Sequence, residues 1–102
     1  MSEPKTMPPI HPGEILREEF LIPLGITANR LAIDLGVSPS RINEILKGKR
    51  GISAETALRL GRYFDNIGPE FWLNLQQRYD LEVARDALED RIAHEVRVRR
   101  TA

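Results

Sequence analysis

The stretch GVSPSRINEILKGKR, residues 36–50, decides how this sequence folds. Ser38 is a residue type favoured at a helix N-cap, and Pro39 suits the first helical position because its missing amide hydrogen would be unpaired there. Apolar residues then recur at helical spacing as far as Gly48, a residue type that commonly ends a helix. The stretch therefore predicts one short helix that follows a tight turn at Gly36 and leads into a basic loop.

A second short helix is predicted directly before this turn. Thr27 is a good N-cap for it, and Gly36 ends it. The small Ala32 side chain permits close crossing of the two helices, and Ile42 is placed to enter the core that they share. Two short helices joined by a glycine-containing turn are typical of a helix-turn-helix.

The rest of the sequence predicts three further helices and no strand. The first covers residues 12–21 and is stopped by Pro23 and Gly25. Another begins at the N-cap Ser53, and a long final helix follows, with one possible irregularity near Asp80. The core face predicted for the helix after Ser53 is Ala57, Leu58, Leu60, Gly61 and Phe64. The expected fold class is all-α, with five helices of which the C-terminal one is extended.

A chain of 102 residues is most simply one domain with a single core. Within it we expect three segments. Residues 1–10 hold three prolines and few apolar side chains, and they are predicted to be a flexible N-terminal arm. Residues 11–66 form the helix-turn-helix domain, and residues 67–102 form a C-terminal helical dimerisation segment.

The formal net charge of +0 hides an uneven distribution. Residues 27–64 hold seven basic and three acidic side chains, a net +4, whereas residues 1–26 and 65–102 each carry −2. The helix-turn-helix segment is therefore the electropositive part, as binding to a nucleic acid requires. The sequence has no cysteine, so disulfides and thiolate metal sites are excluded. It also has no apolar run long enough to span a membrane and no leader, so we expect a cytoplasmic protein that does not bind membranes.

The outer side of the helix after Ser38 is predicted to lie in the major groove of DNA, and its side chains can read base edges. Arg41 suits guanine and Asn43 suits adenine, whereas Glu44 could accept a hydrogen bond from cytosine or instead pair with Arg41 or Lys47 along the helix. The predicted base-reading residues are Ser38, Ser40, Arg41, Asn43 and Glu44. The predicted phosphate contacts are Thr27, Lys47, Lys49 and Arg50.

Enzymatic chemistry is not expected. The two histidines, His11 and His94, are far apart and share no carboxylate at metal-ligand spacing, so no metal site is predicted. The serines have no histidine near them in the pattern to act as a base, and no phosphate-binding glycine loop is present. We therefore expect neither a catalytic residue nor a cofactor.

Three linked motifs carry a family resemblance. They are HPGEILREEFLIPLGIT, NRLAIDLGVSPSRINEILKGKRGISAETALRLGRYF and PEFWLNLQQRYDLE. Together they resemble the HigA-type antitoxins within the phage-repressor-like Xre (cro/CI-type) helix-turn-helix family. The resemblance implies a dimer that represses transcription at an operator in its own promoter and neutralises a RelE-like ribonuclease toxin of the HigB type. One departure from the repressor pattern is Pro39, which has no side-chain donor for base reading.

The surfaces for a second copy of the chain and for a toxin are predicted from apolar and acidic side chains rather than from the motifs. Useful DNA affinity normally requires two helix-turn-helix units roughly 34 Å apart, so a homodimer is expected. Its interface is assigned to the apolar face of the final helix, namely Leu81, Ala84, Leu88 and Ile92. A toxin that binds RNA is expected to meet an acidic strip, which is assigned to Glu14, Glu18 and Glu19. Two alternatives remain open at this stage: a stand-alone transcriptional regulator without a toxin, and a module that binds only proteins.

Overall fold

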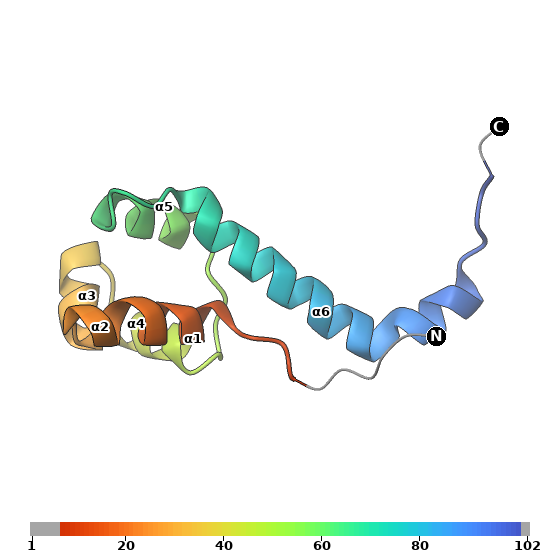
Figure 1. The fold of residues 1–102 in the computed structure, drawn as a ribbon, viewed down its shortest axis with the longest axis horizontal. Helices are drawn as coiled ribbons and strands as arrows, with labels where there is room; N and C mark the ends of the chain where they lie inside the picture. The colour runs from red at the N-terminus through yellow and green to blue at the C-terminus, as the bar shows by residue number, and fades with distance from the viewer. Residues whose placement is uncertain (1–6, 101–102) are drawn as a thin grey trace.

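The computed structural model describes residues 7–100, so residues 1–6 of the predicted arm and residues 101–102 lie outside the described residues. Residues 7–100 form helices and no strand (Figure 1). The elements are α1 (Pro12–Ile15), the π-type turn η1 (Leu16–Leu21), α2 (Ile22–Leu24), α3 (Ala28–Leu35), α4 (Pro39–Leu46), α5 (Ala54–Tyr63) and α6 (Pro69–Glu95). Since α1, η1 and α2 follow one another without a break, this part of the chain has five helices, and the all-α prediction is confirmed.

The first helix is longer than predicted, because Pro23 does not stop it. The amide of Ile22 donates to the carbonyl of Arg17, five residues back, so the helix is widened to π spacing just before the proline. Pro23 removes only one amide donor, and the chain leaves the helix at Gly25, whose φ of 69° is left-handed. The helix therefore ends after Leu24, and the predicted end at residue 21 was wrong.

The helix-turn-helix prediction is confirmed at each position that defines it. The hydroxyl of Thr27 accepts from the amide of Arg30 at 3.0 Å, and that of Ser38 accepts from the amide of Arg41 at 3.2 Å. Between these caps Gly36 takes a φ of 73°, a conformation that other residue types adopt at a cost. Helices α3 and α4 thus begin and turn as their local sequence dictates.

The core face of α5 differs from the prediction at one position. Ser53 caps the helix, and Ala57, Leu60 and Phe64 are buried as expected. Leu58, however, is 64% exposed. It follows Ala57 by one residue and so lies about 100° around the helix from the buried face. The prediction relied on its apolar character, whereas the helical period decides its burial.

Helix α6 is one continuous helix of 27 residues, so the irregularity considered near Asp80 is absent. Its first turns pack on the other helices through Trp72, which is fully buried. The C-terminal, blue part of α6 extends away from the body of the molecule (Figure 1). No helix within residues 7–100 has both the length and the apolar character needed to cross a bilayer.

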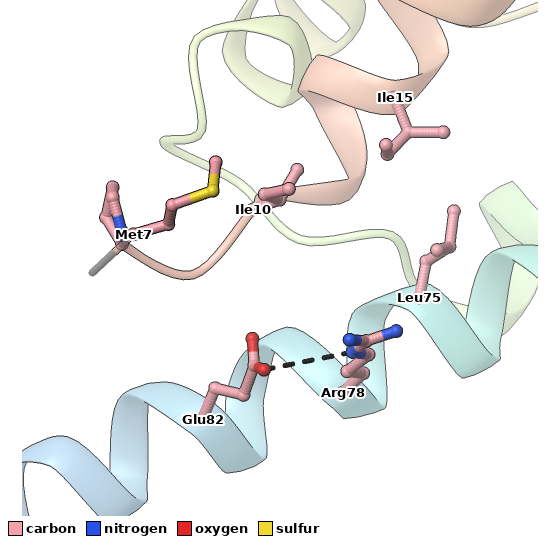
Figure 2. A pocket seen from close by; sticks show the side chains of 7 residues that line it. Met7, Ile10, Ile15, Leu75, Arg78 and Glu82 are labelled. Carbon is pink, nitrogen blue, oxygen red and sulfur yellow. Dashed lines mark ion pairs between the residues drawn. The ribbon is translucent and has the colours of Figure 1, made fainter. Parts of the chain in front are cut away.

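Residues 7–11, which precede α1, run beside α6 and leave a groove between the two segments. Met7 and Ile10 line one side, and Leu75 of α6 lines the other (Figure 2). Arg78 and Glu82, both on α6, form an ion pair beside the groove, with Nε and Oε2 3.8 Å apart. The groove has a volume of about 280 Å³. Residues 7–10 are not helical, and the flexibility of the arm stays a prediction.

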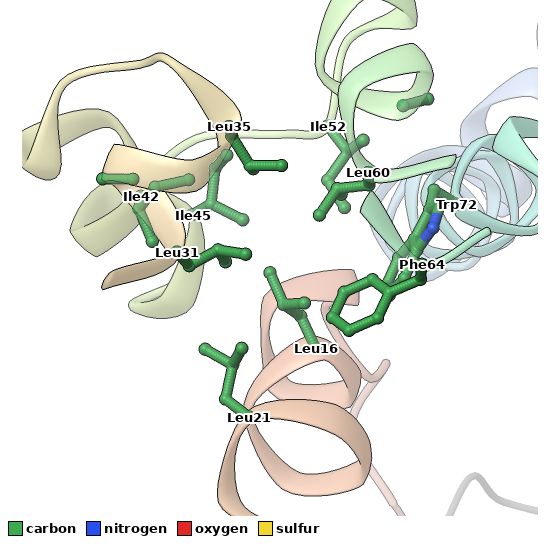
Figure 3. Close-up of a cluster of buried hydrophobic side chains, with 12 residues drawn as sticks. Leu16, Leu21, Leu31, Leu35, Ile42, Ile45, Ile52, Leu60, Phe64 and Trp72 are labelled. Carbon is green, nitrogen blue, oxygen red and sulfur yellow. The ribbon is translucent and has the colours of Figure 1, made fainter. Parts of the chain in front are cut away.

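A single apolar core joins the five helices (Figure 3). Its buried side chains come from every helix, from the loop before α5 and from the residue that follows α5: Leu16, Leu21, Leu31, Ala32, Leu35, Ile42, Ile45, Ile52, Ala57, Leu60, Phe64 and Trp72. Gly13 permits the first helix to approach α4, because a Cβ there would overlap with the carbonyl oxygen of Ile45. The core therefore fixes α4 on two sides, against α3 and against the first helix.

Candidate nucleic-acid interface

The outer side of α4 is presented to solvent by residues buried on its inner side. Ile42 and Ile45 point into the core and are fully buried (Figure 3). Ser40, Asn43 and Lys47 lie three and four residues apart on the opposite side, and all three are exposed. The structure thus orients these side chains as predicted, on a rigid helix, while their contact with DNA stays a prediction.

The start of α4 carries two adjacent hydroxyl groups. The Oγ atoms of Ser38 and Ser40 lie 3.3 Å apart, and both residues are exposed. Pro39 between them supplies no donor, so the side-chain hydrogen-bonding groups at this end of α4 belong to the two serines. This end of the helix can therefore offer hydroxyl donors and acceptors to a polar partner.

Arg41 is placed differently from the other predicted base readers. Its Nη2 donates to Oγ1 of Thr56 at 2.7 Å and lies 3.4 Å from Oε1 of Glu55, so the side chain is only 22% exposed. Arg41 lies about 100° around the helix from Ile42, on the side next to the start of α5. To read a guanine, its guanidinium would first have to leave these two partners.

Glu55 links three parts of the interface, and sequence reasoning missed this role. Its carboxylate accepts from Arg41 and from Nη2 of Arg59, which lies 3.0 Å away. Arg59 also donates from Nη1 to the carbonyl of Leu35 at 2.8 Å, directly before the turn at Gly36. The hydrogen bond from Arg59, followed by the charge of Arg41, lowers the pKa of Glu55. The spacing of four residues between Glu55 and Arg59 was the available sequence signal.

The partner of Glu44 is Arg50. Oε1 of Glu44 lies 2.8 Å from Nε of Arg50, whereas the sequence left open a pair with Arg41 or Lys47. In the free protein, the positive charge of Arg50 is therefore offset by the carboxylate of Glu44. Lys47 and Lys49 are exposed beside it, and so is Thr27 at the start of α3.

The acidic residues of the first helix are all on the surface. Glu14, Glu18 and Glu19 are exposed, and Oε2 of Glu18 lies 3.1 Å from Nε of Arg17. Within residues 7–100, no group of three or more histidine, cysteine, aspartate or glutamate side chains is placed to hold a metal ion.

The residues assigned to a dimer interface form an uncovered strip on α6. Leu81, Ala84 and Ile92 are exposed, and Leu88 is partly buried. They recur every three or four residues on the side of α6 opposite the buried Trp72. Leu81, Ala84 and Ile92 also line a shallow hollow of about 160 Å³ together with Arg85 and Glu89. Among residues 7–100, no element covers this apolar strip.

Comparison with known proteins places this geometry among DNA-binding proteins. The helix-turn-helix family model matches residues 16–72. Virulence-associated protein I of Dichelobacter nodosus is 62% identical over 78 residues, which cover 76% of this chain and 71% of that protein. Antitoxin HigA-1 of Vibrio cholerae is 40% identical over 73 residues, covering 72% and 68%. The solved structure of the Pseudomonas aeruginosa antitoxin HigA with the higBA promoter is 50% identical, with a TM-score of 0.84 over 87% of this chain and 96% of that one.

Proposed function

We propose a function on the premise that this chain belongs to the HigA-type antitoxins of the Xre helix-turn-helix family. It is an antitoxin that binds operator DNA, as its Pseudomonas aeruginosa relative, solved with a promoter, does. The single observation that carries this proposal is α4. Buried Ile42 and Ile45 fix the helix, and its exposed outer side is polar along its whole length.

The base-reading role belongs, in this proposal, to the outer side of α4. Asn43 can make two hydrogen bonds to adenine, and Ser40 can serve several bases. Arg41 takes part only after exchanging Thr56 and Glu55 for a base, so its contribution is offset by the interactions that it gives up. The full proposed set is Ser38, Ser40, Arg41, Asn43 and Glu44.

The phosphate contacts are proposed for residues that flank α4. Lys47 and Lys49 are exposed cations at its C-terminal end, and Thr27 lies at the start of α3. Arg50 joins them once DNA phosphate displaces Glu44 from its guanidinium. These contacts are independent of base sequence and make the affinity depend on salt.

A homodimer through α6 completes the DNA-binding unit. The strip Leu81, Ala84, Leu88 and Ile92 is apolar and uncovered, and its burial against a second copy would remove it from water. Two copies of α4 would then face the same side of a duplex, as a pseudo-palindromic operator requires.

A ribonuclease toxin of the RelE/HigB type is the proposed protein partner. The supporting observation is the exposed acidic strip of Glu14, Glu18 and Glu19, which is complementary to a surface that holds RNA. Exchange of Glu14 and Glu19 for lysine should weaken toxin binding, whereas the same exchange at Glu70, an exposed acid on α6, should not. Equal toxin affinity in the two variants would place the toxin elsewhere.

The experiment that tests the function is a gel-shift titration of the full chain against the DNA upstream of its own gene. A scrambled duplex of the same length serves as competitor. We expect a complex that survives the competitor and loses affinity steeply as salt rises. Binding that the scrambled duplex competes away equally well would contradict sequence-specific recognition. Co-purification of the product of the neighbouring reading frame separates an antitoxin from a solitary regulator.

A further inference from the structure

The loop over residues 47–53, which joins α4 to α5, carries three of the proposed phosphate contacts, Lys47, Lys49 and Arg50. We call this segment the exit loop. Its first half is held by the end of α4, where the amide of Lys49 donates to the carbonyl of Glu44 at 2.8 Å. Its second half is not helical until α5 begins at residue 54, and there the side chain of Ile52 is buried in the core while the backbone has no helical hydrogen bonds.

A side chain of α6 holds this second half. The amide of Ile52 donates to Oε1 of Gln76 at 2.8 Å, across 24 residues of sequence. Nε2 of Gln76 donates to Oδ1 of Asp80 at 2.9 Å, one helical turn further along. The second hydrogen bond fixes the orientation of the amide group, because the nitrogen must face Asp80 and the oxygen must then face Ile52. Gln76 is thus oriented as an acceptor for the exit loop.

The loop is shaped to receive this side chain. A Cβ at Gly51 would lie 3.1 Å from the amide atoms of Gln76, closer than such contacts normally are. The absence of a side chain at Gly51 therefore permits the close approach of α6. The backbone conformation does not require a glycine at this position, because the φ of Gly51 is not left-handed and other residue types can adopt it. The close approach of Gln76 is what requires it.

Helix α6 also supports the exit loop through His11. The rings of His11 and Tyr79 meet edge to face with their centroids 4.8 Å apart. On its other side the His11 ring lies against Gly48, where a Cβ would be 3.6 Å from Cγ of the histidine. Tyr79 follows Gln76 by three residues, so both lie on one side of α6. Two adjacent turns of α6 thus support both halves of the loop.

We propose that Gln76 is a positioning residue for DNA binding. It holds the exit loop so that Lys49 and Arg50 meet the DNA backbone without a prior ordering step, and it does so from the helix that carries the proposed dimer strip. The inference rests on the proposed function, and it assigns to the first half of α6 a role in DNA binding apart from dimerisation. A loop that is already ordered loses less conformational entropy on binding.

The test compares Gln76→Met, which keeps the length of the side chain and removes its hydrogen bonds, with Gln77→Met at the exposed neighbour. We would measure the affinity of each full-length protein for operator and for scrambled duplex over a range of salt concentrations. Gln76→Met should weaken both duplexes by the same factor, about three- to tenfold, because one hydrogen bond is lost and phosphate contacts ignore sequence. Its salt dependence should stay that of the wild type, because Lys49 and Arg50 reach the same phosphates once the loop is ordered, and Gln77→Met should match the wild type in affinity as well.

A second variant approaches the same contact from the loop. Gly51→Ala crowds the Gln76 amide and should give the same loss, and the double variant should lose little more than either single one, because both remove one interaction. Faster hydrogen exchange at the amide of Ile52 should accompany each loss, while sedimentation should show an unchanged oligomeric state.

The outcomes separate the inference from the function on which it rests. Faster exchange at Ile52 with wild-type affinity for both duplexes would overturn the positioning role while leaving operator binding intact. A loss confined to the operator would also overturn it, because that result would make Gln76 part of base recognition. Failure of the wild type to prefer its operator would contradict the proposed function, and failure to bind any duplex would overturn both proposals.

Discussion

Helix α4 and the second half of α6 each expose one face to solvent, but the face of α4 is polar and that of α6 is apolar. The face of α4 is polar, and the helix beneath it is fixed by the fully buried Ile42 and Ile45. The second half of α6 shows apolar side chains, such as Ile92 at 45% exposure, and has no buried residue after Trp72. A polar face on a rigid support suits a polar ligand, whereas an apolar face on an unsupported helix suits a second protein surface.

The largest effect on dimerisation and operator binding is expected from a charged residue on the apolar strip of α6. Leu88→Asp should dissociate the proposed dimer and weaken operator binding by about a hundredfold, since the two half-sites would no longer be bound by one particle. The matched control is Leu58→Asp, because Leu58 is an equally apolar, exposed residue of α5 outside the strip. Sedimentation and operator titration are the measurements. A Leu88→Asp protein that stays dimeric would assign the interface to another surface.

A cavity beneath α4 should have the next largest effect. Ile45→Ala removes a fully buried side chain and should lower the free energy of unfolding by about 2 to 5 kcal/mol. Ile33→Ala on α3 is the control, because Ile33 is 60% exposed and its truncation should change stability little. Urea unfolding followed by circular dichroism gives both values. Equal changes in the two variants would mean that α4 is not fixed by its inner side.

Removal of the hydroxyl of Thr56, which accepts from Arg41, tests how Arg41 is held beside α4. Thr56→Val keeps the shape of the buried side chain but removes the oxygen that accepts from Arg41 and from the hydroxyl of Ser53. The free energy of unfolding should fall by about 1 to 2 kcal/mol, because these donors lose a protein partner. Arg41→Ala in the Thr56→Val background should then cost less than in the wild type. Additive losses would show that the two residues are not coupled.

The smallest predicted effect concerns pH. The neutral His11 ring accepts from the amide of Gly13 through Nδ1, and burial lowers its pKa from 6.5, while the charge of Asp80 acts in the opposite direction. Because the unfolded chain binds the proton more readily, stability should fall as pH drops through 6.5 toward the lower pKa of the folded state. His11→Asn keeps a helix cap without a titrating group, so its melting temperature should vary less over this range. Identical pH profiles for the two proteins would rule out this linkage.

The local features of the fold could be predicted because each depends on a few neighbouring residues. The caps Thr27, Ser38 and Ser53 and the left-handed Gly36 act through hydrogen bonds within five residues, so their sequence pattern suffices. Pro23 was misjudged because the π-type widening before it depends on the register of the whole first helix.

The contacts between side chains of different helices could not be predicted. Arg41 binds Thr56 and Gln76 binds Ile52 only because of how α4, α5 and α6 cross, and sequence spacing does not determine those crossings. The outward set Ser40, Asn43 and Lys47 was predictable from the helical period alone, since Ile42 and Ile45 define the inner side. Which of these residues touches a base depends on the DNA, and this part of the account stays a prediction.

The most direct test of the central claim, that the outer side of α4 reads bases, is the ratio of operator to scrambled-duplex affinity for Asn43→Ala. Asn74→Ala, at an exposed asparagine of α6, is the control. The account predicts that Asn43→Ala lowers the ratio by the equivalent of about 1 to 3 kcal/mol through weaker operator binding, while Asn74→Ala leaves it unchanged. An unchanged ratio for Asn43→Ala, with both affinities intact or falling together, would contradict the claim.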